Sequence, residues 1–162
     1  MIIQRLTQQD YPAVKRIYEQ GLATGNSTFQ TSAPEWEEWD SSHLATCRIV
    51  GMKDNEVIGW AALTPVSGRC VYAGVAEVSV YVDQSFRGKG FGTTLLEALI
   101  RESEKNNVWT LQAGIFPENT SSIRIHEALG FRQIGYREKI GKLNGVWRNT
   151  LLLERRSTVI GV

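Results

Sequence analysis

The sequence lacks several features that would point to particular classes of protein. It has only two cysteines, Cys47 and Cys70, and they do not show the paired spacing of zinc or redox sites. No apolar run approaches the roughly 20 residues that span a bilayer, and residues 1–10 do not show the basic and apolar regions of a secretory signal. These absences argue against a metal site and a membrane protein, and they predict a cytoplasmic location.

An excess of charge of one sign is also missing. The chain has 18 Lys and Arg against 17 Asp and Glu, a formal net charge of +1. It therefore has no bulk positive field to attract nucleic acid or an anionic membrane, and any anion site must be local. The apolar share of 42% and the length of 162 residues suit one soluble domain, residues 1–162, with its own core.

Apolar periodicity predicts alternating strands and helices. Strands are expected at residues 2–6, 46–52, 57–63, 76–82, 109–115, 131–140 and 146–153, and helices at 8–23, 34–44, 93–105 and 119–129. Turn-forming residues at 54–55 and 142–145 predict two antiparallel hairpins. The strand, helix and strand between 76 and 115 predict a right-handed crossover between parallel strands. The expected fold is a mixed α/β sheet with helices on its faces.

The glycine-rich segment 87–92, with the sequence RGKGFG, is the most informative stretch. Glycine permits close backbone approach, so amide groups at the start of the following helix can converge on a phosphate. Arg87 and Lys89 add positive charge. A flexible surface turn with solvated cations is the alternative. The spacing is not that of a Walker A loop or a Rossmann fingerprint, which argues against a nucleotide triphosphatase or a dehydrogenase.

The positions of Arg87, Gly90 and Gly92 resemble the pyrophosphate-binding signature of the GNAT acetyltransferases. The runs 77–82, 119–123, 126–127, 130–131, 141–142 and 145–147 are similar to the phosphinothricin acetyltransferase group of that superfamily. The resemblance covers nearly the whole chain. It implies the GNAT fold, a central mixed and mostly antiparallel sheet with helices on both faces, and acetyl-CoA as co-substrate without a metal.

The resemblance also implies which residues hold acetyl-CoA. A strand splayed from its neighbour offers unpaired amides and carbonyls to the pantetheine arm, and this role would fall to Val80, Tyr81 and Val82. The pyrophosphate would be bound by Arg87, Gly88, Lys89, Gly90, Phe91, Gly92 and Thr93. Asn119 and Ser122 would lie beside the pantetheine, although Asn119 also suits a helix cap.

Acyl transfer to an amine needs a proton acceptor for the amine and a proton donor for the departing thiolate. Valines alternate with other residues in strand 76–82, so Glu77 faces away from them. Glu77 is the candidate base, acting directly or through water, and a structural ion pair is the alternative. His126 stands where many GNAT enzymes carry a tyrosine that protonates the thiolate, and a packed histidine is the alternative. A backbone amide of the strand would stabilise the oxyanion.

The related enzymes acetylate the α-amino group of glutamate-like compounds, including phosphinothricin, methionine sulfoximine and methionine sulfone. The resemblance therefore implies detoxification of an amino-acid analogue. A substrate carboxylate needs a cation or directed amides, and Arg69 is a candidate. Only Arg69 and Tyr72 remain of the Arg-x-x-Tyr-Arg-x-Thr pattern that is typical of the group, which leaves the substrate side chain open. Thr28 and Phe29 match the substrate-side loop, with core packing the alternative for Phe29.

Two other functions fit the same pattern. The first is a noncatalytic acyl-CoA-binding sensor, in which the loop holds the cofactor and no amine reacts. The second is acetylation of another amine, such as a peptide N-terminus or a polyamine. The presence of both Glu77 and His126 argues against the sensor. The resemblance implies a small-molecule amine substrate, and acetylation of another amine stays open within the enzyme class. Homodimer formation is an expectation that the residues leave open.

Overall fold

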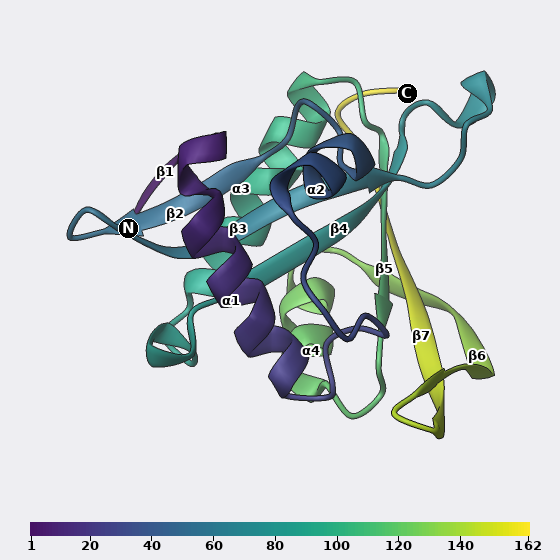
Figure 1. Cartoon of the computed structure of the whole chain (residues 1–162). Coiled ribbons are helices and arrows are strands. Elements are labelled where there is room, and N and C mark those ends of the chain that lie inside the picture. The colour runs from purple at the N-terminus through teal and green to yellow at the C-terminus, as the bar shows by residue number, and fades with distance from the viewer.

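A seven-stranded sheet forms the centre of the molecule (Figure 1). The computed structural model describes residues 1–162. Three short 3₁₀ turns lie at Gln8–Asp10, Cys70–Tyr72 and Gln84–Phe86. The strands are β1 (Ile2–Arg5), β2 (Ile49–Lys53), β3 (Glu56–Pro65), β4 (Val75–Val82), β5 (Thr110–Ile115), β6 (Arg132–Leu143) and β7 (Val146–Arg156), and the helices are α1 (Tyr11–Ala23), α2 (Trp36–Ser42), α3 (Phe91–Lys105) and α4 (Thr120–Ala128).

The strands lie in the order β1-β2-β3-β4-β5-β7-β6. β4 and β5 run parallel, and every other neighbouring pair runs antiparallel. Helix α3 connects the two parallel strands, because such strands need a crossover rather than a tight turn. The hairpin turns contain Asp54, Asn55 and Asn144 at positive φ. These observations confirm the expected mixed, mostly antiparallel sheet.

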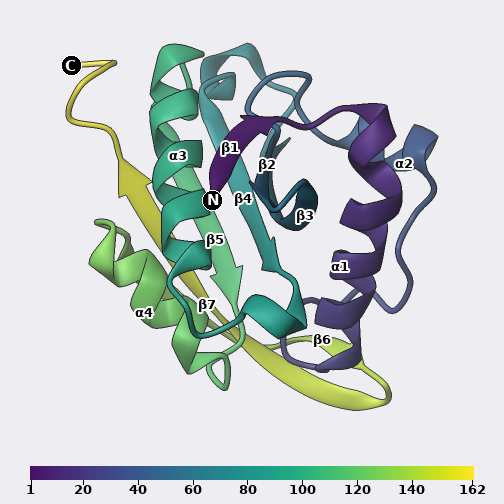
Figure 2. The same cartoon turned by 90° about the vertical axis from the view of Figure 1, so that its left-hand side faces the viewer.

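Helices cover both faces of the sheet, with α3 and α4 on one face and α1 and α2 on the other (Figure 2). The first face buries the apolar stripe of α3, including Leu95 and Leu99, against the sheet. The second face buries Trp39 of α2 and Trp60 of β3 beneath α1. Successive residues of a strand point to opposite faces. Accordingly, the alternate valines of β4 pack on the first face, whereas Tyr81 packs on the second.

β4 and β5 are paired over only part of their length. Three residue pairs join them, Val75 to Thr110, Ala76 to Leu111 and Glu77 to Gln112. Beyond Glu77 the strands diverge, as Figure 1 shows, and β5 continues to pair with β7 as far as Ile115. The edge of β4 that faces β5 is therefore free of strand partners from residue 78 onward.

Several element boundaries differ from those expected. Helix α1 begins at Tyr11 after the 3₁₀ turn, and β6 and β7 extend further, because their pairing continues to Leu143 and Arg156. Two other differences have a local cause. Helix α2 is shorter than 34–44, because Pro34 precedes its N-cap, Glu35, and does not enter the first turn. β2 begins at Ile49 rather than at residue 46, since Cys47 has a φ of 57°, which extended backbone does not accommodate. Arg48 turns inward and donates to Asp40 and to the carbonyl of Leu44. None of the helices is both long and apolar enough to cross a membrane.

Candidate active site

A pocket of about 700 Å³ opens where β4 and β5 diverge. Its walls come from β4, the α1–α2 loop, the end of β5, α4 and the β6–β7 hairpin. It brings together most of the residues that the sequence indicated for acetyl-CoA, catalysis or substrate. Those that line it are Thr28, Phe29, Glu77, Val80, Tyr81, Val82, Arg87, Gly92, Asn119, Ser122 and His126.

Glu77 lies at the point where the two strands separate. It is half-buried, and its Oε1 accepts a hydrogen bond from Gln112 Nε2 at 3.5 Å. No Lys, Arg or His forms an ion pair with it, so the alternative of a structural ion pair has no support. Gly114 on β5 lies beside the carboxylate, since a Cβ there would be in van der Waals contact with Oε1, at 3.6 Å. The arrangement leaves Glu77 available to accept a proton in the pocket.

The glycine-rich segment forms the loop that enters α3. Gly90 is the N-cap of this helix at φ 83°, and Gly88 has a φ of 74°. These left-handed conformations cost glycine little, because it has no side chain to clash with the backbone. The amides of the first helical turn have no acceptor within the helix, and they point outward from its positive end. The loop therefore has the geometry of an anion site.

The cations of this loop are held by nearby carbonyls. Arg87 Nε donates to the carbonyl of Val82 at 3.3 Å, and Lys89 Nζ donates to that of Ser85 at 3.2 Å. Arg87 and Gly92 reach the pocket wall. The remaining expected pyrophosphate residues are not among those that line the pocket. Gly88, Lys89 and Gly90 lie in the loop, and Phe91 and Thr93 lie in the first turn of α3. Their binding roles stay predictions.

Asn119 caps α4 and also fastens a second loop. Its Oδ1 accepts from the amide of Ser122 at 3.3 Å, which confirms the expected cap. Its Nδ2 donates to the carbonyl of Asn26 at 3.2 Å, so the start of α4 is tied to the α1–α2 loop. The predicted contact of Asn119 with the cofactor is compatible with both bonds, since the residue lines the pocket.

His126 is buried, with only 5% of its surface exposed, and packs edge-on against Phe131 at 4.9 Å between ring centroids. Its Nδ1 donates to the carbonyl of Ser122 at 2.7 Å, since a carbonyl oxygen only accepts. Burial lowers the pKa of His126, which favours the neutral ring. In that form Nε2, which is buried without a partner, carries a lone pair and no proton. Donation to a thiolate would therefore require the charged form that burial opposes.

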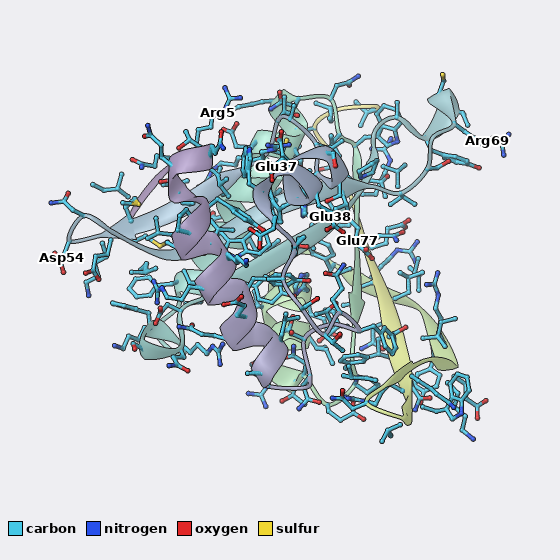
Figure 3. The ribbon with its side chains drawn as sticks, viewed as in Figure 1. Arg5, Glu37, Glu38, Asp54, Arg69 and Glu77 are labelled. Atoms are coloured by element: carbon cyan, nitrogen blue, oxygen red, sulfur yellow. The ribbon has the colours of Figure 1, made fainter.

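Thr28 and Phe29 lie in the α1–α2 loop and line the pocket. Phe29 packs edge-on against Phe116 at 4.9 Å between ring centroids, so it is both a packing residue and part of the wall. Arg69 and Tyr72 are exposed and do not line the pocket. Figure 3 shows Arg69 at the far end of a projecting loop, away from Glu77. The structure does not bring these two residues to the site of the same chain, and their substrate role stays a prediction.

Arg148 on β7 is a residue that the sequence did not single out. Its guanidinium donates to the carbonyl of Gly25 at 2.8 Å and to Asn26 Oδ1 at 2.8 Å. It also contacts Glu118 Oε2 at 3.3 Å and lies over the ring of Phe116, 4.2 Å from the centroid. Only 16% of its side chain is exposed. Arg148 thus fixes the α1–α2 loop to the end of β5. No local motif signals this role, because the bonded residues of the loop lie 123 and 122 positions away.

We expect Arg148→Met to lower the free energy of unfolding by about 1–3 kcal/mol, because three hydrogen bonds of a charged group are lost. Urea unfolding at neutral pH measures the change. Arg132→Met is the matched control, since Arg132 is 74% exposed and contacts only Glu154, at 3.5 Å. An exposed pair of this kind contributes about 1 kcal/mol or less. Equal losses in the two variants would show that Arg148 does not hold the loop.

Arg137 on β6 is a second pocket residue without a sequence signal. It is exposed, and it forms no ion pair or side-chain hydrogen bond. β6 bulges just after it: residues 138–140 lie between the pairs Arg137 to Thr150 and Gly141 to Arg148, where β7 has only Asn149. Bulges of this kind redirect side chains and occur often beside active sites. Ile140 and Gly141 reach the pocket wall through this bulge.

Comparison with known proteins agrees with this geometry. Residues 7–131 match the model of the acetyltransferase (GNAT) family. The chain is 34% identical over 156 residues to an L-methionine sulfoximine/L-methionine sulfone acetyltransferase of Pseudomonas aeruginosa, covering 90% of this chain and 88% of that protein.

Two solved structures resemble the fold closely. One is a ribosomal-protein-alanine N-acetyltransferase from Brucella melitensis, with a TM-score of 0.89, 28% identity and coverage of 97% of this chain and 100% of that one. The other is an acetyl-CoA complex of a GNAT superfamily phosphinothricin acetyltransferase from Sinorhizobium meliloti, with a TM-score of 0.86, 25% identity and coverage of 96% and 87%. This chain therefore belongs to the GNAT family of acetyltransferases, enzymes that use acetyl-CoA as co-substrate.

Proposed function

We propose that residues 1–162 act as one domain that acetylates the amino group of an amino-acid-like small molecule. The observation that carries this proposal is the position of Glu77, a carboxylate without a cationic partner at the point where the β4–β5 opening begins. The relative from Pseudomonas aeruginosa, named for its action on L-methionine sulfoximine and sulfone, supports a substrate of this class. Detoxification of an amino-acid analogue stays a prediction.

The opening fits acetyl-CoA. The free edge of β4 beyond Glu77 offers amides and carbonyls to a pantetheine arm, and Val80, Tyr81 and Val82 would hold it. The first-turn amides of α3, with Arg87 beside them, would bind the pyrophosphate. Acetyl-CoA supplies an activated acetyl thioester.

The residues of the pocket would then serve a direct transfer between two bound substrates. Glu77 accepts a proton from the ammonium group, directly or through water, and frees the lone pair that forms the new C–N bond. A backbone amide of β4 stabilises the negative oxygen of the tetrahedral intermediate. As the C–S bond breaks, the nitrogen gives up a second proton and the thiolate takes up one, so the products are the amide and the free thiol of CoA. His126 would supply the proton of the thiol only after its Nε2 is protonated.

A second candidate substrate is the N-terminal amine of a protein. The likeness to the ribosomal-protein-alanine N-acetyltransferase favours it. The two candidates differ in size: an amino-acid-like substrate is small compared with a pocket of about 700 Å³, whereas a protein would enter it with its N-terminus alone.

The deciding experiment measures thiol release from acetyl-CoA by the purified protein. The amines tested are L-methionine sulfone, L-methionine sulfoximine, phosphinothricin, a polyamine and a peptide beginning with alanine. Turnover of the amino-acid analogues above the peptide and the polyamine is expected. Tight CoA binding without turnover of any amine would identify the protein as a sensor instead.

Direct transfer also predicts that neither cysteine is needed. Cys47 is buried, its pKa is raised by desolvation, and it lies in a second pocket of about 490 Å³ between β1, β2 and α3. Cys70 is exposed on the projecting loop. A variant with Cys47→Ala and Cys70→Ser should keep its turnover within about twofold, because no thiol lies in the catalytic pocket. Initial-rate kinetics should show intersecting lines, and parallel lines or a trapped acetyl-thioester would contradict direct transfer.

A further inference from the structure

An amino acid brings two opposite charges to the pocket, and the pocket offers one free partner for each. The charged side chains that line it are Glu77, Arg87, Glu118 and Arg137. Glu118 is paired with Arg148, and Arg87 lies at the entry to α3, where the pyrophosphate is expected. Glu77 and Arg137 are left without ion-pair partners. A carboxylate close to an arginine gains charge-assisted, bidentate hydrogen bonds.

Strand register places these two residues on the same face of the sheet. Glu77 and Gly114 share a face, since a Cβ on Gly114 would lie 3.6 Å from the carboxylate. Gly114 pairs with Leu152 on β7, and Thr150, two residues earlier on that strand, points the same way. Arg137 is the cross-strand partner of Thr150. Cross-strand partners share a face, so Glu77 and Arg137 lie on the same face of the sheet, and both line the pocket.

We propose that Arg137 binds the carboxylate of the substrate while Glu77 receives the proton of its ammonium group. This inference rests on the proposed function and makes it more specific: the substrate is an α-amino acid with a free carboxylate, not an amine in general. Arg69, the cation that the sequence suggested for this task, lies outside the pocket of the same chain.

The test compares L-methionine sulfone with its carboxamide, which keeps the amine and removes the negative charge. The wild-type enzyme should favour the acid in kcat/KM by at least about tenfold. Arg137→Gln should lower kcat/KM for the acid by roughly 10- to 100-fold, the usual worth of hydrogen bonds to a charged group. It should leave the carboxamide rate, the KM for acetyl-CoA and the thermal midpoint unchanged. Arg137→Lys should recover part of the preference, because it keeps the charge without the planar fork.

Arg132→Gln, on the same strand but outside the pocket, is the matched control and should keep the wild-type preference. Preference for the acid that persists in Arg137→Gln, or that is lost in Arg69→Gln instead, would overturn the assignment of Arg137 and leave the acetyltransferase function intact. Equal use of acid and carboxamide by the wild-type enzyme would also overturn it. A wild-type enzyme that acetylates neither compound would overturn the amino-acid function itself, and with it this inference.

Discussion

Replacing Glu77 with glutamine should reduce kcat by about 100- to 10,000-fold, the range that general-base assistance typically supplies. Glutamine keeps the size of the side chain and its hydrogen bond with Gln112, but it does not accept the proton of an ammonium substrate. The loss should shrink as pH rises, because more of the amine is then already deprotonated. Steady-state rates between pH 6 and 10, with the CoA affinity from calorimetry, measure both effects.

Glu97→Gln is a suitable control for this experiment. Glu97 is a carboxylate on the surface of α3, 54% exposed and paired with Arg101, and it should show wild-type rates at every pH. If Glu77 only braced the strand, Glu77→Gln would lower the thermal midpoint or weaken CoA binding while the residual rate kept the wild-type pH profile. That result would assign the base to another residue or to water.

Gly90→Val should weaken CoA binding by roughly 100-fold or more. A valine is strained at the φ of 83° that Gly90 adopts, so the loop must shift to relieve the strain. The shift would turn the first-turn amides of α3 away from the pyrophosphate, and each lost hydrogen bond to a charged group costs about 1.5–3 kcal/mol. Calorimetric titration of the folded variant with CoA measures the loss.

The matched control is Gly145→Val. Gly145 has a similar φ of 79°, and a Cβ added there, as at Gly90, would meet no atom within 4 Å. Gly145, however, lies in the β6–β7 turn. The two variants should lose comparable thermal stability, and only Gly90→Val should lose CoA affinity. Wild-type affinity in Gly90→Val would remove this loop from the cofactor site.

Local patterns in the sequence were enough to predict most of the fold, and together with the resemblance to the GNAT acetyltransferases they indicated 11 of the 29 residues that line the pocket. Alternation in β4 placed Glu77 opposite the valines, and the spacing of polar residues placed Asn119 at the cap of α4. Both features depend on residues a few positions apart. The glycine-rich loop could be predicted in the same way, because the two residues that adopt left-handed conformations in it are both glycines.

The substrate side of the pocket was harder to predict, because its contacts are long-range. No motif in the sequence marks Arg148 or Arg137, and their positions in the pocket region depend on strand register and on a bulge in β6. Arg69 lies within a family-like motif, but the motif does not reveal that its loop projects away from the sheet. The state of His126 also escaped prediction, since it follows from burial and from the carbonyl that its Nδ1 meets.

The clamp that Arg148 makes has a consequence for engineering new specificities. The residues that line the pocket fall within three ranges of the chain, 21–29, 77–126 and 137–150. In the proposed function the middle range holds most of the cofactor residues, and the two outer ranges form the amine side. Since Arg148 joins these two segments through Gly25 and Asn26, neither can be exchanged alone without leaving hydrogen-bonding groups unmatched. A chimera that takes only the α1–α2 loop from a relative should fold poorly or lose amine selectivity, whereas one that takes the loop together with the β6–β7 hairpin should transfer the donor's preference as a unit.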